Sequence, residues 1–197
     1  FGNADSQETV IKSLMQYYPR YTGYALLTMD MEYMGAGIPK QRFKEQVDQL
    51  AALKKSPAYA DRIFPFIFID PRRILPQSKA EKKIEDKYCG QAFINDVTEK
   101  VNNGSYNGFK FYPALGYYPF DKRLKPVYDM AIQNDLPLVA HVTMGTVHHK
   151  YRLTSAERKH PVTGVVLPDL KPAEFQQFFT HPLNFKFLLE KTDLTKA

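Results

Sequence analysis

Side chains that can bind a metal ion or transfer a proton lie at the end of each of four apolar runs in this sequence. In chain order they are Asp30 and Glu32, Asp70, Lys110 with Tyr112, and His141. Imidazole is the commonest protein metal ligand, and histidine, carboxylates, lysine and tyrosine can all transfer protons. If the four runs are parallel strands, their C-terminal ends converge where α/β proteins place their sites. The sequence therefore predicts a pocket lined by these residues, with His141 as a metal ligand or a general base.

Each of these residues also has an ordinary structural interpretation. A strand-end histidine is more often a hydrogen-bonded core residue than a ligand. Asp30 and Asp70 can cap the helices that follow them, and Lys110 can pair with either. The chain has no HxH, HExxH or CxxC motif, so spacing alone does not define a metal site. Four further histidines lie in polar sequence typical of loops: His148, His149, His160 and His181.

Strands and helices are predicted to alternate along the chain. The apolar runs predict strands at 24–29, 62–70, 108–113 and 136–142, of which the first is expected to be buried on both faces and the second to be buried. Helical spacing of apolar residues predicts helices at 9–18, 40–55, 93–103, 124–135, 172–179 and 182–191. The stretch 77–103 is polar and helical in part, and 145–180 is a loop-rich excursion. This order indicates an α/β fold with a parallel sheet.

Alternation along "GFKFYP" separates two sets of side chains. Phe109 and Phe111 share one face of the strand, and Lys110 and Tyr112 share the other. If the phenylalanines contact the helices, Lys110 lies on the interior face of the sheet. A lysine there is costly unless it is paired or functional.

The composition fits a globular protein and argues against nucleic-acid-binding, membrane-spanning and disulfide-rich proteins. The length of 197 residues predicts a single domain, 1–197. The net charge of +6 comes from basic residues interleaved with acids, without a nucleic-acid-binding motif, so nucleic acid is not an expected partner. No apolar run is long enough to span a bilayer. The lone Cys89 excludes a disulfide framework within the chain and fits a reducing, cytoplasmic location.

A resemblance to a known family rests on four segments: "YALLTMDMEYMGAG", "RIFPFIFIDPRR", "GFKFYPALGYYPFDKRLKPVYDMAIQNDLPLVAH" and "HPLNFKFLLEK". They resemble successive βα units of an amidohydrolase-related TIM barrel, in the branch of aminocarboxymuconate-semialdehyde decarboxylase-like enzymes. The likeness spans most of the chain. Its most specific part is the third segment, where strand, proline-bounded loop, helix and histidine strand appear in the family's order.

The resemblance implies a (β/α)8 barrel that binds one or two divalent metal ions, usually zinc, at its C-terminal mouth. In that family the first strand gives an HxH pair, the fifth and sixth strands one histidine each, and the eighth an aspartate. His141 matches the fifth-strand ligand. Lys110 matches a fourth-strand position that is a carboxylated, metal-bridging lysine in some branches and not a ligand in mononuclear ones.

The chain departs from the family pattern in what it lacks. It has no HxH pair before Tyr24, and neither the sixth-strand histidine nor the eighth-strand aspartate. The expected fold is therefore a partial TIM barrel with about four of the eight parallel strands, the internal portion of a longer polypeptide. Four strands cannot close a barrel and would leave two apolar edges exposed.

The function expected from the resemblance is that of a metal-dependent hydrolase. It would act on a C–N or C–O bond through a metal-activated water, with zinc as the cofactor. Lys110 and Tyr112 would line the pocket of a small, anionic substrate. The alternatives are a metal-dependent nonoxidative decarboxylase of the same superfamily and a non-catalytic barrel fragment that binds a ligand or partner. No membrane partner is expected, and homo-oligomerisation is left open.

Overall fold

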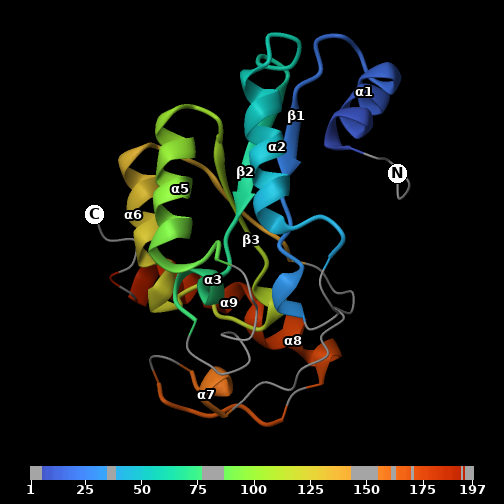
Figure 1. Ribbon diagram of the computed structural model, residues 1–197. Coiled ribbons are helices and arrows are strands. Elements are labelled where there is room, and N and C mark those ends of the chain that lie inside the picture. The colour runs from blue at the N-terminus through green and yellow to red at the C-terminus, as the bar shows by residue number, and fades with distance from the viewer. Residues whose placement is uncertain are drawn as a thin grey trace.

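Four parallel strands form one sheet in the computed structural model, which describes residues 6–34, 39–76, 87–142, 155–160, 163–169, 171–191 and 193. The strands are β1 (Tyr24–Leu27), β2 (Ile63–Phe68), β3 (Gly108–Phe111) and β4 (Leu138–Ala140). They pair in sequence order, and the sheet curls like half of a barrel (Figure 1). The predicted strands and their parallel arrangement in a mixed α/β fold are confirmed, with shorter strand bounds than predicted.

Helices connect the strands and extend beyond them. They are α1 (Gln7–Tyr17), α2 (Phe43–Lys55), α3 (Pro71–Ile74), α5 (Gly90–Asn102), α6 (Lys125–Gln133), α7 (Ser155–Arg158), α8 (Pro172–Phe179) and α9 (Pro182–Lys191), with 3-10 turns η1 (Glu32–Met34), η2 (Pro113–Leu115) and η3 (Lys122–Leu124). All six predicted helices are confirmed. Predictions for 77–86 and 145–154, including His148 and His149, fall outside the described residues.

One face of the sheet carries the core. Figure 1 shows α2, α5 and α6 over this face. Ile67 and Phe109 are completely buried there with Val47 of α2, and the ring of Phe111 lies 5.7 Å from that of Tyr128 in α6. The phenylalanines of β3 therefore contact the helices, and Lys110 lies on the opposite, inner face of the sheet.

The inner face of the sheet is open near β1, which corrects one prediction. The run "YALL" was expected to be buried on both faces, but Leu27 is 44% exposed and Phe64 of β2 is 40% exposed. The ammonium group of Lys54 in α2 lies 4.9 Å from the centroid of the Phe64 ring, but Leu27 and Phe64 both keep a large exposed area. A continuous apolar run predicts burial on both faces only where both faces have a partner.

Gly108 lets β3 approach its neighbours closely. A Cβ atom at this position would lie 2.4 Å from Cε1 of Phe66 on β2 and 2.6 Å from the carbonyl oxygen of Pro137. Both distances are shorter than non-bonded carbon atoms tolerate, so only glycine fits where the Phe66 ring crosses β3.

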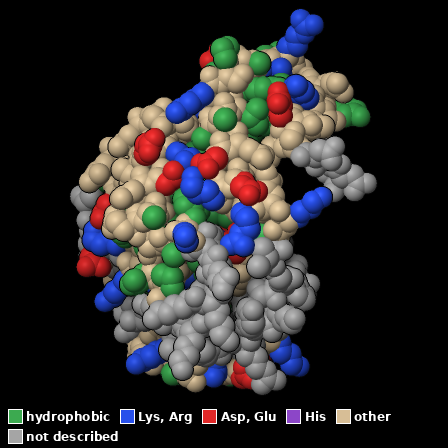
Figure 2. Space-filling model, in the orientation of Figure 1, with side chains coloured by type: hydrophobic (Ala, Val, Ile, Leu, Met, Phe, Trp, Pro, Cys, Tyr) green, Lys and Arg blue, Asp and Glu red, His purple; other side chains and the backbone are tan. Residues whose placement is uncertain are grey.

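The surface charges are interleaved, as the sequence predicted. Figure 2 shows basic and acidic side chains side by side over α2 and α5. Lys44 and Asp48 of α2 are joined at 2.8 Å, and Lys100 of α5 contacts Asp96 at 2.5 Å and Asp48 at 3.0 Å. Acids and bases thus pair within and between these two helices. None of the described helices is long and apolar enough to cross a membrane.

Candidate functional site

The C-terminal ends of the four strands lie along one edge of the sheet, beside α3, α8 and α9 (Figure 1). The six residues predicted from the sequence all belong to this edge, but the structure divides them into two groups. The carboxylates of Asp30, Glu32 and Asp70 are bound by arginines. Lys110, Tyr112 and His141 form a separate group at the ends of β3 and β4.

Asp30 and Glu32 belong to a buried ion-pair network centred on Arg73 of α3. Arg73 is 0% exposed, and its guanidinium donates to Asp30 Oδ2 at 2.7 Å, to Glu32 Oε2 at 2.9 Å and to the carbonyl oxygen of Tyr88. Arg42, just before α2, contacts Glu32 Oε1 at 3.0 Å. Both carboxylates thus have charged donors, which reduce the cost of removing them from water, although burial outweighs the attraction of Arg73 and still raises the pKa of Asp30.

Four aromatic rings enclose the Arg73 guanidinium. Its central carbon lies between 5.0 and 5.9 Å from their centroids, within the range of cation–π attraction. The rings belong to Phe43, Tyr33, Tyr88 and Phe93. They come from four elements or loops, so Arg73 ties η1, α2, α3 and α5 together at the edge of the sheet.

Asp70 caps α3 and pairs with Arg72. Its Oδ1 accepts a hydrogen bond from the Arg72 backbone N–H at 2.9 Å, and its two oxygens accept from the guanidinium at 2.8 and 2.6 Å. Burial raises the pKa of Asp70, but the charge and hydrogen bonds of Arg72 outweigh this effect and leave the pKa below its usual value. The capping interpretation is confirmed for Asp70. A role for it in a substrate pocket stays a prediction.

Arg72 and Arg73 are the residues of this edge that sequence reasoning missed, because "PRR" was counted among scattered positive charges. A usable signal was present. Two arginines follow a strand-end aspartate after one proline, and an acidic pair follows the neighbouring strand. Arginines beside buried carboxylates are the usual means of keeping such acids charged.

Lys110 differs from the other buried charges at this edge. Its side chain is 4% exposed, and among the described residues no carboxylate, carbonyl or hydroxyl binds its ammonium group. Burial lowers the pKa of Lys110. The sequence left open a pairing with Asp30 or Asp70, but those acids bind Arg73 and Arg72 instead. Lys110 is thus a largely buried side chain whose ammonium group has no counter-ion among the described residues.

His141 and Tyr112 lie beside Lys110. The backbone N–H of His141 donates to the carbonyl of Phe111 at 2.9 Å, and the imidazole lies 4.2 Å from the Tyr112 ring, centroid to centroid. Partial burial and the charge of Lys110 lower the pKa of His141, so its ring is neutral near pH 7. The side chain is exposed, which argues against the interpretation as a core histidine.

Tyr117 holds the end of β3 in place and was not singled out in the sequence. Its buried hydroxyl accepts from the Tyr112 N–H at 2.7 Å and donates to the Ile69 carbonyl at 3.2 Å. This bridge fixes the backbone of Tyr112 against the end of β2. Because its backbone is fixed in this way, Tyr112 holds its ring beside the imidazole of His141.

The remaining described histidines have structural roles. His160 was expected to be an ordinary loop residue, but its ring packs among Tyr118, Phe120 and Phe187 at centroid distances of 5.0 to 5.8 Å. His181 is exposed, and its Nδ1 accepts from the N–H of Leu183 at the start of α9. Neither is part of the Lys110 group.

Among the described residues, no three His, Cys, Asp or Glu side chains gather in a group that could hold a metal ion. Of the six predicted site residues, His141 has an exposed, neutral imidazole that suits a metal ion. The three acids of this set already bind arginines. No family model matches the chain, and no significant match is found among curated proteins or solved structures.

Proposed function

We propose that this chain forms part of the active site of a metal-dependent hydrolase, in which the four strands are half of a (β/α)8 barrel. The observation that carries the proposal is Lys110, buried without a counter-ion beside a neutral, exposed His141 at the C-terminal edge of a parallel sheet. Such an arrangement costs stability, and proteins keep costly arrangements chiefly at functional sites.

The three grouped residues have distinct roles in this proposal. Lys110 binds an anionic group of the substrate, because a partly desolvated cation attracts an anion more strongly than a cation in water does. His141 is a metal ligand. The ring of Tyr112, 4.2 Å from the imidazole, limits the orientations of His141 and closes one side of the pocket.

A zinc ion fits His141 in part. Neutral imidazole is a preferred zinc ligand, and a bound zinc ion supplies an activated water and polarises a carbonyl group. The described residues give one ligand of such a set, and the other donors would have to come from elsewhere in the protein. The proposal therefore assigns His141 as one ligand and leaves the set incomplete.

A nonoxidative decarboxylase is the second candidate, and Lys110 is the observation that favours it. A buried ammonium group suits a substrate carboxylate, which is the group that such an enzyme removes. Assays of the intact protein on amide and ester substrates and on unsaturated carboxylic acids separate the two. Hydrolysis supports the first function, and release of carbon dioxide supports the second.

The first experiment is zinc binding to the protein and to the variant His141→Ala. We expect the variant to bind zinc about tenfold or more weakly than the unchanged chain, because a ligand is lost. Calorimetric titration and elemental analysis measure this. His181→Ala is the matched control, since His181 is exposed and lies outside the Lys110 group. Equal zinc binding by both variants would contradict the proposal.

A further inference from the structure

The outer side of β1 and the outer side of β4, which we call the β1 edge and the β4 edge, have unpaired backbone groups within the described part of the chain. The N–H groups of Tyr24 and Thr28 donate to the carbonyls of Arg62, just before β2, and Phe66 of β2, so Ala25 and Leu27 direct theirs away from the sheet. At the other edge His141 donates to β3, so Leu138 and Ala140 direct theirs outward. An unprotected strand edge is a template for another strand.

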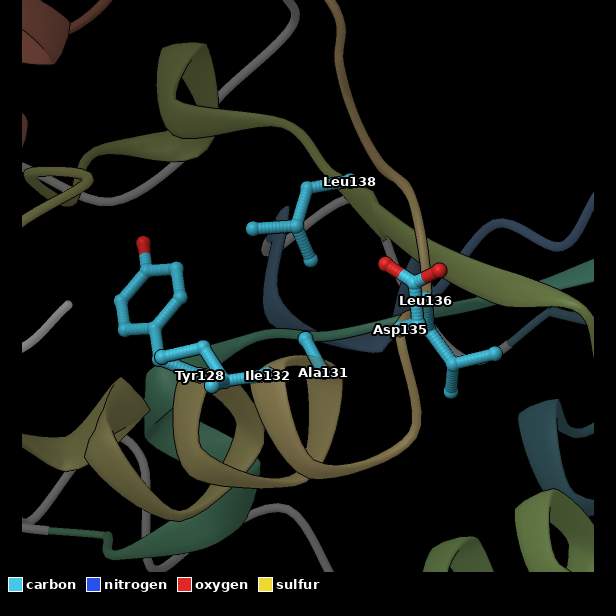
Figure 3. A pocket seen from close by; sticks show the side chains of 6 residues that line it. All are labelled: Tyr128, Ala131, Ile132, Asp135, Leu136 and Leu138. Carbon is cyan, nitrogen blue, oxygen red and sulfur yellow. The ribbon is translucent and has the colours of Figure 1, made fainter. Parts of the chain in front are cut away.

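The β4 edge also carries a pocket of about 220 Å³ between the C-terminal half of α6 and the start of β4. Figure 3 shows its lining, which is Tyr128, Ala131, Ile132, Asp135, Leu136 and Leu138. Ile132 and Leu138 are 43% and 41% exposed. Asp135 is the only charged residue in the lining. The pocket is thus an open apolar hollow with one acid at its border.

The β1 edge has the complementary features at the same end of the strands. Three exposed tyrosines lie between the end of α1 and the start of β1: Tyr17, Tyr18 and Tyr21. Two arginines lie in or beside this segment: Arg20 is exposed, and Arg62 donates to the carbonyl oxygens of Pro19 and Thr22. Projecting aromatic and basic groups at one edge match the apolar, acidic hollow at the other.

We propose that a second copy of this chain docks edge to edge, so that β4 of each copy pairs in parallel with β1 of the other. A parallel ladder brings the N-terminal ends of the two strands together. The tyrosines then lie at the partner's pocket, and Arg20 and Arg62 lie near the partner's Asp135. Two curled sheets of four strands related by a two-fold axis make the eight strands of a closed barrel.

Closure also covers the open inner face. Leu27 and Phe64, which are exposed in the single chain, become part of the barrel interior. The Lys110 groups of the two copies then face a common mouth. This dimer does not depend on the proposed function, because it rests on strand edges, apolar surface and charge alone.

The test is the mass of the 197-residue chain in solution, measured by light scattering and sedimentation across micromolar concentrations. We expect twice the chain mass of 22.7 kDa, about 45 kDa. A monomer at every concentration would overturn the proposal and leave both edges to strands of a longer chain. The mass does not depend on zinc, so this outcome is separate from that of the His141 experiment.

Two matched variants distinguish edge pairing from other dimers. Ala25→Pro and Ala140→Pro each remove an outward N–H without removing a bond inside the sheet. We expect each alone to raise the dimer dissociation constant by about tenfold or more, since each damages both interfaces. Mixing the two restores dimers, because a mixed pair has one interface in which both strands are unchanged. Absence of recovery on mixing would overturn the edge pairing.

A second pair of variants tests the docking through side chains alone, in case the proline variants fail to fold. Ile132→Lys places a charge in the pocket and is expected to weaken the dimer, with circular dichroism unchanged. Leu189→Lys is the control, because Leu189 of α9 is 67% exposed and does not line the pocket. Equal dimerisation of these two variants would contradict docking at the pocket.

Discussion

Replacing Arg73 with methionine is expected to lower the free energy of unfolding by about 3–5 kcal/mol. The substitution keeps much of the apolar contact with the surrounding rings but removes the donors to Asp30 and Glu32. Both carboxylates lie in a region with almost no solvent contact, so Asp30 loses its arginine partner without gaining water, and Glu32 keeps Arg42 as its one arginine partner. An uncompensated buried charge is among the most destabilising single changes in a protein.

Urea unfolding followed by circular dichroism measures the Arg73→Met effect, and pH tests its cause. In the variant the buried acids have raised pKa values, so folding favours their protonated form. The destabilisation should therefore shrink as pH falls from about 7 to about 5. Lys125→Met is the control, because Lys125 forms an exposed pair with Asp129 and should change stability by about 0.5 kcal/mol or less. A pH-independent loss would indicate a packing defect instead.

The pairing of Asp30 with Arg73 shows where sequence reasoning stops. The two residues are 43 positions apart, and they meet because β1 and β2 pair in a register that aligns Leu27 with Phe66. The sequence predicted both strands and their direction from apolar runs and helix spacing. It could not predict the register, because neither strand has a feature that distinguishes one alignment from its neighbours. Without the register, the partner of each carboxylate stayed open.

The face of β3 on which Lys110 lies was predictable, because it does not depend on the register between strands. Its side was fixed by alternation with Phe109 and Phe111, which depends only on local geometry. Exposure of Leu27 was not predictable, since it depends on what covers the inner face and not on β1 itself. Local periodicity therefore predicted the orientation of side chains, while their final environment depended on contacts between distant segments.

Lys110→Met is expected to raise the free energy of unfolding by about 1–3 kcal/mol while weakening binding of an anionic substrate by about tenfold or more. The substitution removes a largely buried cation that no described residue neutralises. Because burial lowers the folded pKa of Lys110 below its unfolded value of 10.5, the unfolded chain binds more protons between these values. Stability of the unchanged protein should thus rise with pH across that window, and the variant should lose this slope.

Lys100→Met is the matched control, since Lys100 is also buried but binds Asp96 and Asp48. Burial favours the neutral form of Lys100, but the hydrogen bonds and charges of the two acids have a larger effect and raise the pKa of Lys100. Its replacement should lower the free energy of unfolding by about 1–3 kcal/mol, opposite in sign to Lys110→Met. Thermal and urea unfolding of both variants measure this contrast. If Lys110→Met is also destabilising, Lys110 has a structural partner, and the argument for a functional lysine fails. If the signs differ, the fold keeps Lys110 against its own stability, which is the behaviour of a residue retained for binding or catalysis.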